Sequence, residues 1–320
     1  MRAVFSGRTL TIRLINLYWS KHRRAATTKQ PQHMTYRPTT FRYAIASTAL
    51  LLALVSAARA ASNIDLPPSA CQPNPALVFA GGFESQPWQA QPSAGNGGAS
   101  GASQRTTPGP QGVSYWLQAP ASRPAAAALV VVLHGAGGPG TAPGNAMATR
   151  DGWAPLAESG GFVVAAPIAS GSQGGWVPAV DFAAIDAVVA DAEAAYDIDR
   201  SRVYVWGFSA GGHIAHTLSL LRNPNRYAAY AVNAGVLEAH AGAQAPSLAP
   251  RRVPVHAAVG DSDTLLSFTQ NDRLRFLNAG WIEQGNYQLR VFAGGHTYGG
   301  ADLAAAWTFF CRHGLLPPLE

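Results

Sequence analysis

The chain contains no lysine after Arg59, and residues 1–60 contain no aspartate or glutamate. Ten of the 23 basic residues lie in residues 1–60, so 13 basic residues remain against 17 acidic ones in the rest of the 320-residue chain. The formal net charge of +6 therefore comes from the N-terminal segment. The rest of the chain has a slight acidic excess, so its composition gives no reason to expect a nucleic-acid partner.

The N-terminal segment also lacks a long apolar run. YAIASTALLLALV, at 43–55, has about 13 residues, whereas a membrane span needs about 20. Arg37 and Arg42 precede it, and Ala58–Ala60 forms a small-residue cleavage site. Residues 1–60 therefore predict a signal peptide, with a possible mis-assigned start before Met34. The protein is expected to be secreted or periplasmic, with no stable membrane span after cleavage; an uncleaved anchor is the alternative.

Cysteine is scarce, and the two present are Cys71 and Cys311. Exported proteins favour paired cysteines, because their compartments are oxidising. We expect one disulfide that joins the start of the exported chain to its last helix. Two unrelated thiols are the alternative.

The chain divides by composition into three parts. Residues 1–60 form the leader, 61–112 a Pro/Gly/Ser-rich segment with a flexible connector at 92–112, and 113–320 an α/β domain. Strands are predicted at 113–118, 127–134, 161–167, 202–208, 227–235, 253–260 and 287–295, and helices at 145–158, 179–196, 210–222, 264–278 and 301–312. This alternation predicts an α/β fold whose mainly parallel sheet carries helices on both faces.

Four polar motifs each follow a predicted strand directly. They are HGAGG, GFSAGG, GDSD and GGHTY, beginning at residues 134, 207, 260 and 294. The carboxyl ends of parallel strands lie at one edge of a sheet, where ligands bind. The four motifs are therefore expected to meet at one site.

Ser209 is the candidate nucleophile. Gly207 to Gly211 fits the pattern G-x-S-x-G between a strand and a helix, the context of a nucleophile elbow. The flanking glycines avoid clashes in so tight a turn, whereas an ordinary helix-capping serine would not require them.

A serine hydroxyl needs a base, and His296 is the candidate because it follows the last strand in a glycine-rich loop. His134 is expected to shape its own loop, and His213 and His216 to pack or face solvent. The remaining alternatives lack a motif or lie at the chain end: His240, His256 and His313.

The orienting acid should lie between serine and histidine in the chain, where GDSD offers Asp261 and Asp263. Asp261 follows a glycine and suits a turn-closing role, so Asp263 is preferred. The order Ser209, Asp263, His296 is that of α/β-hydrolases.

An oxyanion requires fixed N–H donors, and two backbone groups qualify. One is the N–H of Ala210, after the nucleophile; the other is the N–H of Ala136, beside Gly135 in the HGAGG loop. That loop lacks the lysine and spacing of a phosphate-binding loop. No cluster has metal-ligand spacing, so no metal or other cofactor is expected.

With these motifs assembled, residues 113–315 resemble the secreted esterases of the polyhydroxybutyrate depolymerase and feruloyl esterase group. The stretches that carry the resemblance are VVVLHGAGG, GWAPLAESGGFVVAAP, YDIDRSRVYVWGFSAGG, VGDSDTLLSF and GGHTYGG. The resemblance implies an α/β-hydrolase fold, the triad Ser209–Asp263–His296 and an oxyanion hole at Ala136 and Ala210. It also implies substrate contacts from Gly135, Trp176 and Tyr298. For Trp153, two positions are considered: lining the pocket or packing in the core.

The resemblance implies a serine carboxylic-ester hydrolase that works through an acyl-enzyme. Its expected substrates are small or oligomeric: soluble esters, hydroxyalkanoate oligomers or feruloyl-type esters. No separate polymer-binding domain is recognised in residues 61–320, which disfavours crystalline polymers. A serine peptidase or polyamide hydrolase is the first alternative, and a non-catalytic binding protein the second.

Overall fold

The computed structural model describes residues 61–67, 71, 89–109 and 112–316. All of them belong to one compact unit, Ser56–Glu320. The predicted signal peptide lies outside the described residues, so the structure does not bear on it. No helix among the described residues is long and apolar enough to cross a membrane.

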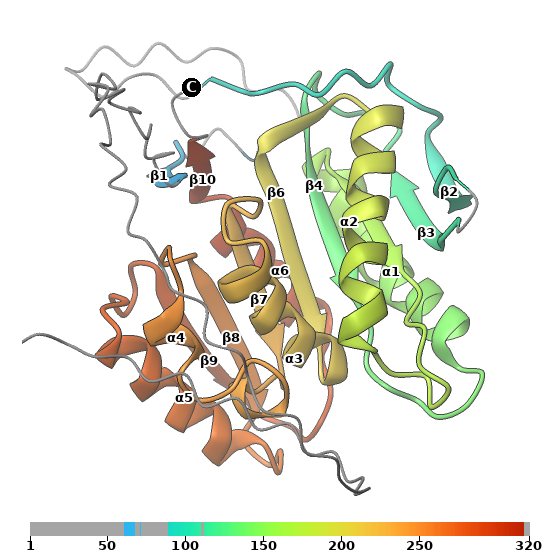
Figure 1. Ribbon diagram of the computed structural model, residues 1–320. Coiled ribbons are helices and arrows are strands. Elements are labelled where there is room, and N and C mark those ends of the chain that lie inside the picture. The colour runs from blue at the N-terminus through green and yellow to red at the C-terminus, as the bar shows by residue number, and fades with distance from the viewer. Residues whose placement is uncertain (1–60, 68–70, 72–88, 110–111, 317–320) are drawn as a thin grey trace, which may run out of the picture. The chain divides into compact units, whose positions relative to one another are not determined.

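An eight-stranded sheet forms the centre of the unit, in the order β2-β3-β5-β4-β6-β7-β8-β9 (Figure 1). The six strands from β4 to β9 run parallel, while β2 and β3 are antiparallel additions at one edge. The bounds are β2 Gly101–Thr106, β3 Ser114–Ala119, β4 Ala127–Leu133, β5 Val163–Pro167, β6 Ile198–Phe208, β7 Ala229–Asn233, β8 Val255–Gly260 and β9 Tyr287–Phe292. The continuous apolar runs of the sequence are the central strands: every residue of β4, β5, β7 and β8 is buried.

Helices cover both faces of this sheet. Trp153 of α1 (Ala142–Gly160) and Phe310 of α6 (Gly300–Phe310) belong to the apolar cluster on one face. Ile185 of α2 (Pro178–Ala195), Ile214 of α3 (Ala210–Thr217) and Phe276 of α5 (Leu266–Asn278) belong to the cluster on the other. A π-helical turn, Leu218–Arg222, extends α3, and a 3₁₀ turn, Leu237–Ala239, and the short α4, Ala245–Leu248, follow β7. The strands and helices predicted from residue 113 onward are all present, with shifted ends.

The prediction of a flexible connector over residues 92–112 is wrong. Residues 101–106 form β2, paired with β3 along its whole length. Upstream of it, the buried hydroxyl of Ser93 donates to the carbonyls of Glu193 and Tyr196, each at 2.8 Å, and accepts the Ile198 N–H at 2.9 Å. The Gly/Ser composition concealed a strand whose pairing with β3 comes from main-chain atoms, which composition does not report.

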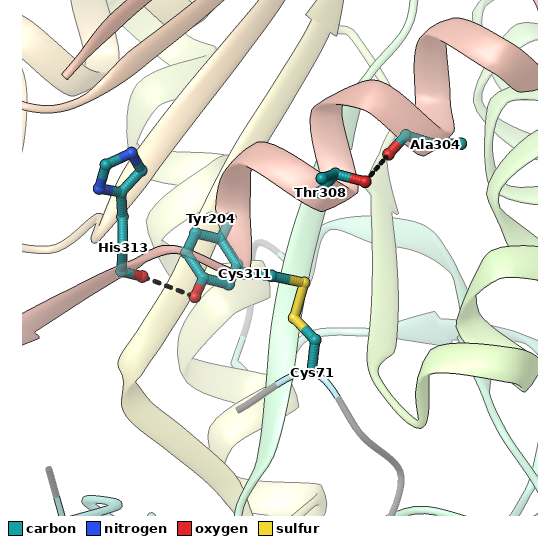
Figure 2. The surroundings of a disulfide bond; sticks show 6 residues. All are labelled: Cys71, Tyr204, Ala304, Thr308, Cys311 and His313. Atoms are coloured by element: carbon teal, nitrogen blue, oxygen red, sulfur yellow. Dashed lines mark hydrogen bonds between the residues drawn. A yellow bond between two sulfur atoms is a disulfide. The ribbon is translucent and has the colours of Figure 1, made fainter. Parts of the chain in front are cut away.

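The first and last described segments lie side by side. β1 (Ser62–Asp65) pairs antiparallel with β10 (His313–Leu316), and buried Arg251 donates to the side chain of Asn63. Cys71 and Cys311 form the predicted disulfide, with 5.5 Å between their Cα atoms (Figure 2). Beside it, the Tyr204 hydroxyl donates to the main-chain oxygen of His313 at 2.8 Å.

Loss of the disulfide should reduce stability substantially. The sequence separation of Cys71 and Cys311 is 240, and closing so long a loop restricts the unfolded chain. By the loop-entropy relation, we expect the Cys71→Ser/Cys311→Ser variant to lose up to about 5 kcal/mol of unfolding free energy. Urea unfolding of both proteins measures the difference, and non-reducing peptide mapping of the exported protein should yield one cross-linked peptide pair. Two free thiols in that protein would contradict the pairing.

The protein should also lose stability in mild acid. Burial lowers the pKa of His216 to about 3 and those of His213, His256 and His313 to about 4. An unfolded chain protonates these side chains near pH 6.5, so it binds more protons than the folded one between about pH 6.5 and 4. Their stabilising effect is complete above that window. As the pH falls through it, each histidine costs up to about 1.4 kcal/mol per pH unit.

Urea unfolding at pH 7 and pH 5 measures this loss. His256→Leu removes one of the titrating groups. The slope of unfolding free energy against pH should therefore decrease by up to about 1.4 kcal/mol per pH unit, the contribution of one proton. A wild-type slope near zero across this window would contradict the prediction.

Candidate active site

The predicted catalytic motifs meet at the carboxyl edge of the sheet. Ser209 follows β6 directly, Asp263 lies three residues beyond β8, and His296 lies four residues beyond β9. Because these strands are parallel, their carboxyl ends open onto one edge.

Ser209 occupies a strained turn between β6 and α3. Its φ of 52° and ψ of −118° are uncommon for a residue with a side chain, and such backbone strain costs about 1–3 kcal/mol. A Cβ at Gly207 would lie 2.3 Å from the Gly211 oxygen, and one at Gly211 would lie 2.1 Å from the Leu133 oxygen. Both glycines of the motif are therefore required by close packing, as a nucleophile elbow needs.

The hydroxyl of Ser209, the ring of His296 and the carboxylate of Asp263 form one hydrogen-bonded chain. Nε2 of His296 lies 2.9 Å from Ser209 Oγ, and Nδ1 lies 2.9 Å from Asp263 Oδ2. An ionised carboxylate only accepts, so Nδ1 donates to Asp263 and Nε2 is free to accept the serine proton. The Asp263 side chain is fully buried, whereas that of His296 is 43% exposed and open to a substrate.

Asp261 has the turn-closing contacts expected of it. Its Oδ1 accepts the N–H of Gly294 and the hydroxyl of Ser262, each at 3.0 Å. The Gly294 N–H is the main cause that lowers the pKa of the exposed Asp261 carboxyl. Asp261 therefore ties the loop after β9 to the turn after β8, and it is Asp263 that contacts His296.

The HGAGG loop lies against the elbow. A Cβ at Gly135 would be 3.4 Å from the Cβ of Ser209, so the main chain of this loop passes close to the nucleophile. Among the described residues, the N–H groups of Ala136 and Ala210 have no acceptor. Both stay available to an oxyanion, the role predicted for them.

Two buried side chains, His134 and Trp176, stabilise the HGAGG loop by hydrogen bonds. Nε2 of His134 accepts the Ala169 N–H at 3.2 Å, and its Nδ1 donates to the Gly135 oxygen at 2.8 Å. Trp176 is only 8% exposed and donates from Nε1 to the His134 oxygen at 2.8 Å. His134 thus shapes its loop as expected. Trp176 supports the same loop from a buried position, and its predicted contact with substrate remains a prediction.

Asp181 stabilises the neighbouring glycine-rich loop. Its buried carboxylate accepts the N–H of Val177 at 2.6 Å and that of Ser170 at 3.2 Å. No sequence motif marks this residue. Its position in the first turn of a helix that follows a glycine-rich loop is the one signal that could have indicated it.

Aromatic side chains border the triad. Tyr298 is half-buried and packs edge-on against Phe208 and Trp206, with 4.9 Å between ring centroids in each pair. Phe208 in turn lies 5.0 Å from the His296 ring. Tyr298 is therefore one aromatic ring away from His296, the candidate base, and its contact with substrate remains a prediction. Trp153 is completely buried and belongs to the core.

Four further histidines of the described residues have structural surroundings. Nδ1 of His213 accepts the Val236 N–H at 2.9 Å, while His216, His256 and His313 are buried. No group of His, Cys, Asp or Glu in the described part of the chain is arranged to hold a metal ion.

Comparison with known proteins bears on the fold and the class. The family model BD-FAE matches residues 117–264, a stretch that contains Ser209 and Asp263. No curated protein matches the sequence.

Three solved structures illustrate the structural relatives. A ferulic acid esterase matches at 17% identity and a TM-score of 0.52, covering 66% of this chain and 97% of its own. The poly(aspartic acid) hydrolase-1 of Sphingomonas sp. KT-1 matches at 18% identity and a TM-score of 0.50, and the match covers 65% of this chain and 99% of the hydrolase. The dipeptidyl peptidase 4 of Porphyromonas gingivalis matches at 15% identity and a TM-score of 0.51. The match covers 66% of this chain but only 35% of the length of the peptidase.

These similarities and the sheet order establish an α/β-hydrolase fold. The fold and the family match together support a hydrolase of the esterase type.

The two neighbouring aspartates should respond differently to mutation. Asp263→Asn should lower kcat by about 10³- to 10⁴-fold, because an amide no longer selects the tautomer that leaves Nε2 free. Asp261→Asn keeps an oxygen for the Gly294 N–H, so its kcat should stay close to wild type while the melting temperature falls. Steady-state ester hydrolysis and thermal unfolding of both variants test this. The reverse ranking would exchange the roles of the two acids.

Proposed function

We propose that this protein is a secreted serine carboxylic-ester hydrolase that works through an acyl-enzyme intermediate. The observation that carries the proposal is the continuous hydrogen-bonded chain from Ser209 through His296 to Asp263, presented on a strained elbow. A plain structural serine requires neither the positive φ nor the histidine.

In the first half-reaction, Oγ of Ser209 attacks the ester carbonyl carbon while its proton passes to Nε2 of His296. The N–H groups of Ala136 and Ala210 stabilise the oxyanion, and the positive end of α3 adds to this. His296 then returns the proton to the leaving alkoxide as the C–O bond breaks. The acyl group stays on Ser209, and the alcohol departs.

In the second half-reaction, water takes the place of the alcohol. His296 accepts a proton from that water as it attacks the acyl carbon, and the tetrahedral oxyanion forms against the same donors. Collapse of this intermediate breaks the bond to Ser209 Oγ, which recovers its proton from His296. The carboxylic acid is released and the enzyme is restored.

We propose soluble esters, hydroxyalkanoate oligomers or feruloyl-type esters as substrates, as in the depolymerase and feruloyl esterase group that the sequence resembles. Tyr298 and Phe208 beside His296 favour an apolar or aromatic group near the scissile bond. The Cys71–Cys311 disulfide supports an exported enzyme.

Amide hydrolysis on the same triad is the second candidate. Two structural relatives, a dipeptidyl peptidase and a poly(aspartic acid) hydrolase, share the fold. A series of p-nitrophenyl esters from acetate to laurate, with p-nitrophenyl ferulate, compared with peptide p-nitroanilides, separates the two. A higher kcat/KM on the anilides would favour the peptidase.

The role of Ser209 has a direct test. Ser209→Ala should lower ester hydrolysis by at least about 10⁴-fold and abolish labelling by a fluorophosphonate probe, because the attacking oxygen is lost. The scaffold does not depend on this hydroxyl, so the circular dichroism spectrum should be unchanged. Ser247→Ala, at an exposed serine of α4, is the matched control and should behave as wild type. Labelling that persists in Ser209→Ala would place the nucleophile elsewhere.

A further inference from the structure

The catalytic base has to reach across the sheet. Ser209 follows β6 and His296 follows β9, and two strands, β7 and β8, lie between them. At about 4.8 Å between neighbouring strands, the loop that carries His296 spans about 14 Å to bring Nε2 to the serine. A glycine-rich loop of this reach needs fixed points of attachment, because its main chain is intrinsically flexible.

Two of the attachments are already described, and both come from the turn after β8. Asp261 accepts the Gly294 N–H at 3.0 Å, before His296, and Asp263 accepts from the ring itself at 2.9 Å. Neither holds the main chain on the far side of the histidine. After it, the next anchor is the Gly299 N–H, which donates to Asp302 at 2.9 Å.

Asn233 fills this gap. It is the last residue of β7, is only 1% exposed, and donates from Nδ2 to the main-chain oxygen of Thr297 at 3.0 Å. Among the described residues, this amide is the one group of another segment that hydrogen-bonds the main chain of residues 295–298. Its partner is the residue directly after His296.

Asn233 also contacts the nucleophile side of the site. Its main-chain oxygen accepts the N–H of Ser209 at 2.9 Å, and it lies opposite Phe208 in the register of β6 and β7. One residue therefore bridges the segment that carries the nucleophile and the segment that carries the base. Strand β7 supplies no member of the triad, yet it lies between the strands that do.

We propose that Asn233 is a positioning residue. The hydrogen bond from its side-chain amide to the main-chain oxygen of Thr297 fixes the distance between Ser209 and His296. This role rests on the proposed hydrolase function. Among the described residues, no hydrogen bond joins the Asn233 side chain to the His296 ring or the Ser209 hydroxyl, so the residue acts through the main chain that it holds. Loss of its side-chain N–H removes the hydrogen bond from the buried Asn233 to the Thr297 oxygen and frees the loop on one side of the base.

Asn233→Leu keeps the side-chain volume and removes the donor, and Asn233→Ala removes it without any risk of a clash. Near-attack geometry is sensitive to shifts of about 1 Å, so each variant should lower kcat by about 10- to 100-fold. KM should change little, because Asn233 does not contact the substrate. The rate of labelling by a fluorophosphonate should fall in parallel with kcat.

Tyr204→Phe is the matched control. It also removes one buried donor to a main-chain carbonyl, that of His313 (Figure 2), and this bond lies outside the loop that carries His296. All proteins are assayed at a temperature where circular dichroism shows them folded. We expect Tyr204→Phe to lower the melting temperature as the Asn233 variants do, with wild-type kcat.

The outcomes separate the two proposals. Wild-type kcat in either folded Asn233 variant, or an equal loss of kcat in Tyr204→Phe, would overturn the positioning role alone. A wild-type protein that neither hydrolyses esters or anilides nor reacts with the probe would overturn the hydrolase function, and this role with it.

Discussion

The left-handed backbone of Ser209 is the constraint on which the site depends. With φ at 52°, the residue turns the chain sharply from β6 into α3 and presents its hydroxyl above the sheet edge. Such a conformation persists only where neighbouring structure enforces it. Here the Ser209 N–H is bound to β7, the loop at Gly135 packs against its Cβ, and α3 begins at once. Packing within the sheet thus provides the free energy that holds the nucleophile in place.

Chemistry and stabilisation occupy opposite edges of the sheet. Near the start of β6, buried Asp199 accepts from Arg202 at 2.7 Å, from the Ser201 hydroxyl at 2.7 Å and from the Gln91 N–H at 2.8 Å. A buried carboxylate is tolerable only when its oxygens are satisfied in this way. The carboxylate thereby fixes Gln91, in the segment that precedes β2, to the sheet. At the other end of the strands, in contrast, the His296 side chain is exposed to solvent.

Sequence patterns predicted most of this arrangement, for identifiable reasons. The central strands are continuous apolar runs because both faces are covered, and the elbow was visible because its glycines are sterically required. Strand β2 was missed because main-chain pairing, not composition, holds it. The choice of Asp263 over Asp261 followed from turn chemistry and from the family resemblance, and the geometry agrees with it. Asn233 could not be predicted, since its role depends on a loop that only the folded chain brings near, and Asp181 was indicated only by its place in the first turn of α2.

The site is distributed over four neighbouring strands, and this makes strand register part of its geometry. The proposed nucleophile directly follows β6, the bridging amide belongs to β7, the proposed acid lies in the turn after β8 and the proposed base in the loop after β9. A shift of one residue along a strand moves a side chain by about 3.3 Å and turns it to the other face. Each link in the chain from Asp263 to Ser209 is 2.9 Å long, so no such shift is compatible with it. The register of these four strands is therefore as necessary to the proposed reaction as the three side chains that carry it out.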